Sequence, residues 1–149
     1  MIATATIRDA ETKDILRIVE MGRKFLLEGP YFEKLADNPD QAEKMTAQIL
    51  KDERARILVA EDADSVIGVF AFLMTEHIFS GDMTAVEMIW YVEPEHRGRT
   101  SLELLWTAER MAKSLGAEYL QATAPTEEVE EIYRKCGFYK VETAYQRKL

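Results

Sequence analysis

Cysteine and histidine are scarce in this sequence of 149 residues, which has only Cys136, His77 and His96. A single thiol excludes an intramolecular disulfide, and these three side chains do not complete a zinc site. No apolar run approaches the roughly 20 residues that cross a bilayer. The first residues lack the charged-then-apolar layout of a signal peptide. We therefore expect a cytoplasmic protein without a bound metal.

Basic charge is also in short supply, with 19 lysines and arginines against 27 acidic residues and a net charge of −8. Such a surface repels phosphate backbones and anionic lipids, so neither a nucleic acid nor a membrane is an expected partner. The chain has no repeat, low-complexity tract or Gly/Ser linker, and its 47% hydrophobic content is typical of globular proteins. Its length favours a single domain over residues 1–149.

Hydrophobic periodicity and turn residues predict an element order of βααβββαβαβ. The predicted strands cover residues 2–7, 56–61, 66–75, 83–92, 119–123 and 139–147. The predicted helices run from an N-cap at Asp9 to Gly29, from about Pro39 with Asn38 as its cap, from about Gly98 to Leu115, and from Glu127 to Cys136. The buried stripe of the third helix is expected at Leu102, Leu105, Ala108, Ala112 and Leu115. Hairpins followed by a βαβ unit predict a mixed sheet covered by helices.

The most informative stretch is WYVEPEHRGRTSL, residues 90–102. A buried strand ends there, and Gly98 opens a long amphipathic helix with Arg97 and Arg99 on either side. The free amides and positive dipole end of a helix N-terminus bind anions. A solvated loop that happens to contain two arginines is the alternative interpretation.

Two motifs resemble the GCN5-related N-acetyltransferase (GNAT) superfamily. Val92-Glu93-Pro94 followed by Arg97-Gly98-Arg99-Thr100-Ser101-Leu102 is similar to the family's phosphate-binding loop, although Thr100 and Leu102 stand where glycines are usual. Ile132-Tyr133-Arg134-Lys135-Cys136-Gly137-Phe138 is similar to the family's Leu-Tyr-Glu-Lys-Leu-Gly-Phe. The stretch from Trp90 to Gly98 also resembles a phage or prophage branch. The resemblance implies an α/β fold with a mixed sheet of about six to seven strands flanked by four helices.

This resemblance implies transfer of an acetyl group from acetyl-CoA to a primary amine of a small molecule or peptide. The pyrophosphate would lie on the amides between Arg97 and Leu102, and pantetheine would lie beside Trp90, Tyr91 and Val92. Tyr133 would serve the leaving thiolate, and Thr126 stands where the family often has an asparagine that contacts pantetheine. Packing of Tyr133 against the sheet is the alternative interpretation.

A general base must take a proton from the amine. Glu87 lies near the position of a catalytic glutamate in several family members, but strict alternation places it on the face opposite Trp90. Only a β-bulge would place Glu87 on the same face as Trp90. His77 is a second candidate, and His96 is expected at the rim of the phosphate loop. The acceptor site is expected to contain the aromatic side chains Phe25, Tyr31, Phe32 and Phe79 and the acidic side chains Glu28, Glu33 and Asp82.

Two other functions stay open at this stage. A non-catalytic, regulatory CoA-binding module would fit the missing glycines, whereas a toxin-type enzyme acting on charged tRNA is disfavoured by the net charge of −8. A homodimer is expected from the superfamily resemblance and from the aromatic and Met content of the early helices and the last strand.

Overall fold

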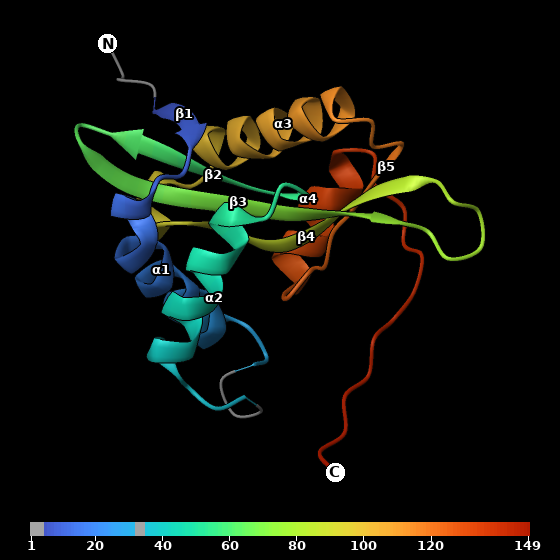
Figure 1. Cartoon of the computed structure of the whole chain (residues 1–149), viewed down its shortest axis with the longest axis horizontal. Coiled ribbons are helices and arrows are strands. Elements are labelled where there is room, and N and C mark those ends of the chain that lie inside the picture. Colours follow the sequence, from blue (N-terminus) through green and yellow to red (C-terminus); the bar gives the residue numbers. More distant parts are fainter. Residues whose placement is uncertain (1–4, 32–34) are drawn as a thin grey trace.

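The computed structural model describes residues 5–31 and 35–149. Its five strands form one sheet in sequence order, with β1 to β4 antiparallel and β5 parallel to β4 (Figure 1). The strands are β1 (Thr6–Asp9), β2 (Ala55–Asp62), β3 (Ser65–Glu76), β4 (Met83–Val92) and β5 (Tyr119–Gln121). The α-helices are α1 (Ile15–Glu28), α2 (Pro39–Lys51), α3 (Arg99–Ser114) and α4 (Glu127–Lys135). The predicted mixed α/β architecture is confirmed.

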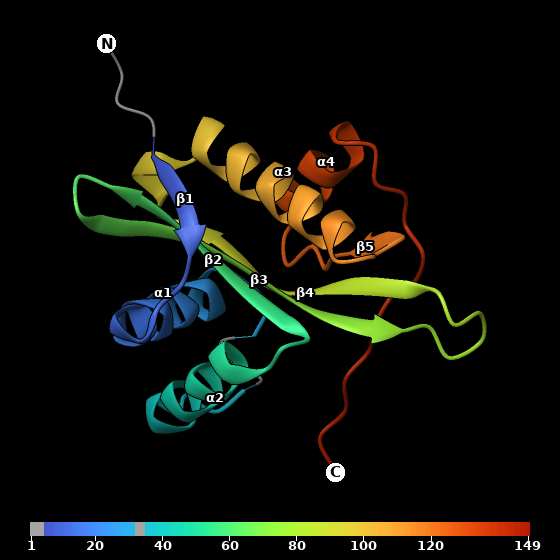
Figure 2. The same ribbon diagram turned by 45° about the horizontal axis from the view of Figure 1, so that its top comes forward.

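Helices cover both faces of the sheet, as Figure 2 shows, with α1 and α2 on one side and α3 and α4 on the other. Alternate residues of β3 therefore enter two different cores. Phe70 and Phe72 pack with Leu104 and Leu105 of α3, whereas Val69 packs on the α1 side. This arrangement holds the middle of β4 between two packed layers.

Local sequence explains most element boundaries. The side chain of Asn38 accepts a hydrogen bond from the amide of Gln41, and Pro39 occupies the first turn of α2, both as predicted. The turn between β2 and β3 places Ala63 and Asp64 at positive φ, the combination that a tight two-residue hairpin turn requires. Gly116 follows α3 with a φ of +98°, as its predicted role as the helix stop requires.

The predicted cap at Asp9 is wrong, because Asp9 ends β1. A short 3-10 turn, Thr12–Asp14, leads into α1, and Glu11 and Asp14 form a reciprocal capping box around it. The buried stripe of α3 also differs from the prediction. Leu104 is fully buried, whereas Leu115 lies beyond the helix and is exposed.

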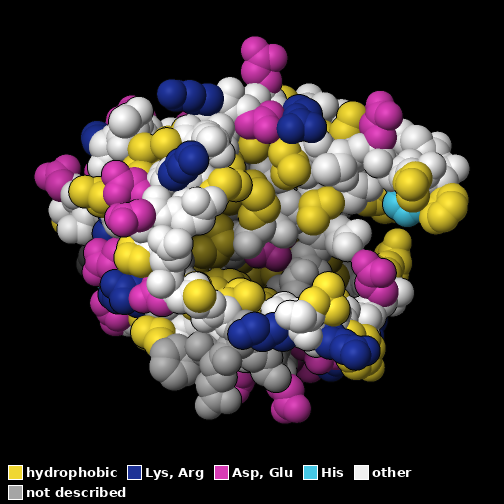
Figure 3. Space-filling model, turned by 60° about the horizontal axis from the view of Figure 1, so that its bottom comes forward, with side chains coloured by type: hydrophobic (Ala, Val, Ile, Leu, Met, Phe, Trp, Pro, Cys, Tyr) yellow, Lys and Arg dark blue, Asp and Glu magenta, His cyan; other side chains and the backbone are white. Residues whose placement is uncertain are grey.

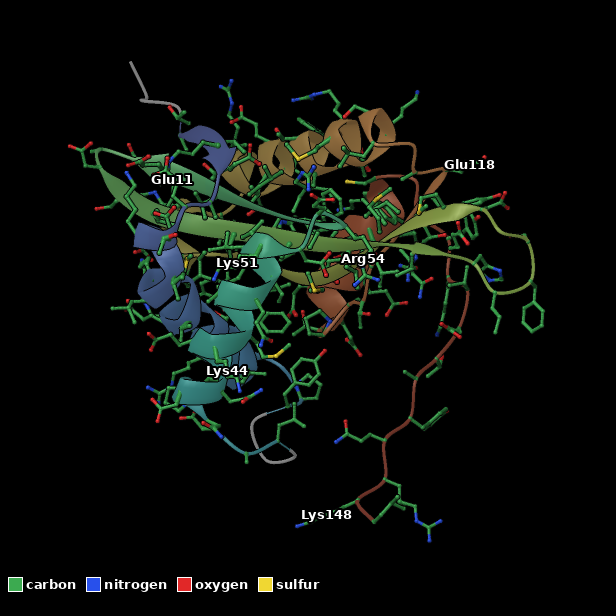
Figure 4. The ribbon with its side chains drawn as sticks, in the orientation of Figure 1. Glu11, Lys44, Lys51, Arg54, Glu118 and Lys148 are labelled. Carbon is green, nitrogen blue, oxygen red and sulfur yellow. The ribbon has the colours of Figure 1, made fainter. Side chains whose placement is uncertain are left out.

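The closing strand predicted at residues 139–147 is not formed, so among residues 5–31 and 35–149 the sheet has five strands instead of about six to seven. The segment is exposed along its whole length, with Tyr139 at 74% and Tyr145 at 94% relative exposure. Lys148, near its end, lies far from the sheet (Figure 4). An alternating sequence forms a strand only when a sheet edge supplies its hydrogen bonds, and no described segment of this chain pairs with it.

Candidate active site

A β-bulge in β4 decides where Glu87 points. Phe70 pairs with Trp90 and Phe72 pairs with Glu87, with a register shift between these two pairs. Because Phe70 and Phe72 share one face of β3, their partners Glu87 and Trp90 share one face of β4. The β-bulge that would place Glu87 on the same face as Trp90 is thus present, with Met88 as the extra residue.

Glu87 is a partly buried carboxyl with few partners. Its Oε2 accepts a hydrogen bond of 3.1 Å from the backbone amide of Thr123, just after β5. No ion pair joins it to a lysine or arginine among residues 5–31 and 35–149. Burial raises the pKa of Glu87 to about 7, because desolvation outweighs the single amide hydrogen bond. A carboxyl with such a pKa exchanges protons near neutrality.

Tyr133 of α4 lies against the same face of β4. Its ring stacks on that of Trp90, with centroids 5.4 Å apart, and it also contacts the ring of Phe138. The Oη of Tyr133 and the Nε1 of Trp90 are buried without a hydrogen-bond partner among the described residues. Burial, followed by the nearby Glu87 carboxylate, raises the pKa of Tyr133 and keeps its phenol protonated. Two unpartnered buried polar atoms are costly in a closed protein and are expected where a ligand supplies the partner.

Glu87 lies at a pocket of about 220 Å³, which we call the Glu87 pocket. Its other lining residues are Phe25, Leu26, Tyr31, Leu35, Met88 and Thr123. Figure 3 shows a hollow on this side of the molecule, with hydrophobic side chains around it and an acidic side chain in its depth. The aromatic wall consists of Phe25 and Tyr31, whose rings stack with centroids 5.6 Å apart.

The sequence predicts this pocket only in part. Phe25 and Tyr31 line it as expected, but Phe79 is 91% exposed at the tip of the β3–β4 hairpin and does not. Phe32 and Glu33 lie outside the described residues. Leu26, Leu35, Met88 and Thr123 have no distinguishing motif, and only the tertiary structure brings them together. Periodicity on α1 and β4 would at most have indicated Leu26 and Met88 as core positions, and Leu35 and Thr123 lie outside helices and strands.

The predicted anion site at the start of α3 is open. Gly98 has a φ of +103°, a conformation that favours glycine, and a Cβ there would meet no atom within 4 Å. Thr100 and Ser101 lie in the first helical turn, where backbone amides have no helical acceptor. The amide of Leu102 already donates to the carbonyl of Gly98 at 3.2 Å, so the free amides end at Ser101.

Both predicted arginines are engaged by other groups. Arg97 donates to the carbonyl of Val92 at 2.7 Å and to the Glu28 carboxylate at 2.7 and 2.8 Å, and its guanidinium lies over the ring of Tyr91. Arg99 pairs with Glu103 at 2.7 Å. An anion at the start of α3 would therefore be held mainly by backbone amides, unless these exposed pairs exchange partners.

The edge of β4 beside this site has no strand partner. β5 pairs only with Thr84–Val86, so β4 from Glu87 to Val92 is left without a neighbour on that side among the described residues. The backbone of Trp90–Val92, where pantetheine is expected, is included in this free edge. The Thr126 side chain accepts from the amide of Val129 as the N-cap of α4, which gives this residue a structural role.

The remaining candidates lie away from the Glu87 pocket. His77 is exposed in the β3–β4 hairpin, where its Nδ1 accepts from the amide of Phe79. His96 lies 3.9 Å from the Asp62 carboxylate. Asp82 belongs to the same hairpin as His77, and its carbonyl accepts from the His77 amide. Neither histidine nor Asp82 lines the Glu87 pocket.

Within the described ranges, no cluster of three or more histidine, cysteine or carboxylate side chains is arranged to hold a metal ion. No helix in the part of the chain that the structure describes is both long and apolar enough to span a membrane.

Comparison with known proteins decides the family. Residues 23–138 match the sequence model of the acetyltransferase (GNAT) family. The chain belongs to this family. It matches no curated protein sequence. No comparison supports the narrower resemblance to a phage or prophage branch.

Solved structures share the GNAT fold over nearly the whole chain. A "predicted acetyltransferase with acetyl-CoA" from Clostridium acetobutylicum is 18% identical with a TM-score of 0.80, covering 97% of this chain and 96% of its own. A transcriptional regulator from Bacillus halodurans is 21% identical, with a TM-score of 0.79 and coverages of 97% and 99%. Glucosamine-6-phosphate N-acetyltransferase from Arabidopsis thaliana is 14% identical, with a TM-score of 0.77 and coverages of 98% and 99%. At these identities the likeness shows the fold alone.

Proposed function

We propose that this GNAT protein transfers the acetyl group of acetyl-CoA to a primary amine of a small molecule or peptide. The observation that carries the proposal is the bulge in β4, which places Glu87 on the same face as Trp90 and its stacked partner Tyr133. A carboxyl that titrates near neutrality and a protonated phenol thus lie beside an unpaired strand edge. The open N-terminus of α3 supports a pyrophosphate site at the end of this edge.

Each side chain has one role in the reaction. Glu87 accepts one proton from the ammonium of the acceptor, which frees the nitrogen lone pair. The nitrogen attacks the thioester carbonyl carbon, a C–N bond forms, and the C–S bond breaks. Tyr133 donates its proton to the departing sulfur and regains one as the nitrogen loses its second proton. The products are an amide, free CoA thiol and one proton that Glu87 releases to solvent.

The substrate thioester would be held mainly by the backbone. The amides of Gly98, Arg99, Thr100 and Ser101 would receive the pyrophosphate, and the free edge of β4 from Trp90 to Val92 would pair with pantetheine. The family relationship supports acetyl-CoA as the donor.

Thermal melting with acetyl-CoA tests the binding half of this proposal. A ligand at a hundred times its dissociation constant stabilises the native state by about 2.7 kcal/mol. Gly98→Glu should abolish the rise in Tm, because it places a negative side chain in front of the free amides. Gly98→Ala separates this effect from backbone strain at positive φ, and should retain a rise in Tm. An unchanged wild-type Tm at millimolar acetyl-CoA contradicts the proposal.

A non-catalytic CoA-binding module is the second candidate. The pairing of Arg97 with Glu28 and of Arg99 with Glu103 favours it, because arginines engaged by carboxylates leave a weaker phosphate site than an efficient acetyltransferase needs. Release of free CoA thiol with a panel of amines distinguishes the two. A module of this kind would show a rise in Tm with acetyl-CoA and no thiol release.

We also propose that the protein is a single-domain homodimer. The exposed apolar side chains of the tail, Tyr139, Val141, Tyr145 and Leu149, support a partner surface. Light scattering at high micromolar concentration tests this assembly, and a monomeric mass there contradicts it.

A further inference from the structure

The size and lining of the Glu87 pocket indicate which kind of acceptor it can bind, which the family relationship does not. Its described lining is apolar or aromatic except for Glu87 and Thr123. The stacked rings of Phe25 and Tyr31 form the aromatic wall, and Leu26, Leu35 and Met88 provide the remaining apolar surface. The volume of about 220 Å³ is below the range of roughly 300–1,000 Å³ that accommodates drug-sized ligands. A small molecule or a single side chain fits this space.

The charged residues at this pocket indicate that the acceptor has no anionic group. Glu87 is the only described carboxylate that lines it, and no described lysine or arginine does. On α1, Lys24 donates to Glu93 at 2.9 Å and Arg23 pairs with Asp37 at 2.6 Å, and neither side chain lines the pocket. A phosphate or carboxylate on the acceptor would find no described counter-ion here. Burial of such a group without a partner is unfavourable.

A second ammonium group is disfavoured for the same reason. Glu87 is the one carboxylate among the described lining residues, so it can pair with one ammonium, and the hydroxyls of Tyr31 and Thr123 have no charge that would balance a second. Contact of the apolar walls with CH₂ groups or an aromatic ring of the acceptor instead makes the free energy of binding more favourable.

We propose that the acceptor is a small primary amine on an apolar or aromatic arm, with neither an anionic group nor a second ammonium. This inference rests on the proposed acetyltransferase function and specifies its acceptor. The amine nitrogen lies at Glu87, and the arm lies between the Phe25–Tyr31 wall and the leucines.

Four primary amines test this specificity in the full chain with acetyl-CoA. 2-Phenylethylamine is the apolar monoamine, and phenylalanine has the same skeleton with a carboxylate added. Spermidine represents amines with further ammonium groups, and glucosamine 6-phosphate represents amines with a phosphate. Thiol release should give a kcat/KM for 2-phenylethylamine at least tenfold above that for each of the other three. A preference for any of the three overturns the inference and leaves the acetyltransferase function in place.

A charge introduced into the wall sharpens this test. Leu35 lines the pocket but is 46% exposed, so Leu35→Arg should not impair folding. We expect it to lower kcat/KM for 2-phenylethylamine about tenfold and to raise that for phenylalanine. Leu16→Arg is the matched control, because Leu16 is 69% exposed on α1 and does not line the pocket. Equal effects of the two variants contradict the assignment of this pocket to the acceptor.

Calorimetric measurement of 2-phenylethylamine binding tests the acceptor pocket separately from the proposed acetyltransferase activity. Binding that Leu35→Arg weakens, without thiol release from any amine, supports the pocket assignment and contradicts the proposed catalysis. If 2-phenylethylamine neither binds nor reacts, the inference is wrong, whatever acetyl-CoA does to the Tm.

Discussion

Two carboxyl groups, one in the turn before α1 and one in β4, have opposite environments. Asp14, next to β1, is 4% exposed and accepts hydrogen bonds from both terminal nitrogens of Arg8, at 2.8 and 3.0 Å, and from the amide of Glu11 at 2.8 Å. The Arg8 guanidinium is the largest cause that lowers the pKa of Asp14. Glu87, in the bulge of β4, accepts one amide hydrogen bond, and burial raises its pKa to about 7.

The difference shows how one fold uses buried charge in two ways. A carboxylate with an arginine and a backbone amide is satisfied by the protein and holds elements together. A carboxyl that lacks a cation leaves its charge to be balanced by something that arrives, such as the ammonium of a substrate. We therefore expect a substitution of Asp14 to change stability and, if Glu87 is the proposed general base, a substitution of Glu87 to change turnover.

Glu87→Gln should have the largest effect on turnover. The amide cannot accept the proton of the ammonium, so kcat/KM should fall by about 10²–10⁴-fold, the scale of general base catalysis. The rise in Tm with acetyl-CoA should persist, because the substitution leaves the α3 N-terminus unchanged. Glu118→Gln, at an exposed position (Figure 4), is the control and should retain full activity. Wild-type turnover in Glu87→Gln would assign the base to another group.

Tyr133→Phe tests the role proposed for the Tyr133 phenol as the acid that protonates the leaving sulfur. The ring and its stacking on Trp90 remain, and only the buried hydroxyl is lost. Turnover should fall by about 10²-fold if the phenol protonates the leaving sulfur. Acetyl-CoA affinity, measured by calorimetry, should barely change, because a ground-state hydrogen bond contributes only about 0.5–1.5 kcal/mol. Full activity would show that Tyr133 only packs.

Asp14→Asn should affect stability and leave catalysis intact. Hydrogen bonds to charged groups contribute about 1.5–3 kcal/mol, which for a chain of this size corresponds to a fall in Tm of roughly 3–12 °C. Because the pKa of Asp14 is lowered in the folded state, its stabilisation is present above the unfolded pKa and is lost as the pH falls through the folded pKa. The difference in Tm should thus be large at pH 7 and should shrink in acid. A lowered kcat at saturating substrates, below the melting range, would contradict the purely structural role.

The smallest expected effect is a stability gain from Glu87→Gln. The folded pKa of about 7 exceeds the ordinary value of 4.5, so the native state binds this proton more tightly than the unfolded state. Stability therefore falls as the pH rises from about 4.5 through about 7. The variant, which has no charge to bury, should match the wild type near pH 4.5 and melt a few degrees higher at pH 8. Equal melting temperatures at pH 8 would show that Glu87 is well solvated when ionised.

Local sequence signals determine much of this protein. Asn38 and Pro39 begin α2, a two-residue hairpin turn joins β2 to β3, and β4 spans Met83–Val92 as the flanking turn residues predict. These features depend on neighbours in the chain, so periodicity and capping reveal them. The motifs at Gly98 and Tyr133 likewise predict the GNAT family, which the match over residues 23–138 confirms.

Tertiary structure alone decided the features that depend on pairing between distant segments. The bulge that turns Glu87 toward Tyr133 exists only in the register between β3 and β4, and alternation within β4 predicts the opposite face. The tail at residues 139–149 shows the reverse case, because its alternation favours a strand but no described edge pairs with it. The tendency of a segment to form a strand depends on its own residues, whereas the strand with which it pairs, and the register of that pairing, depend on the assembled sheet.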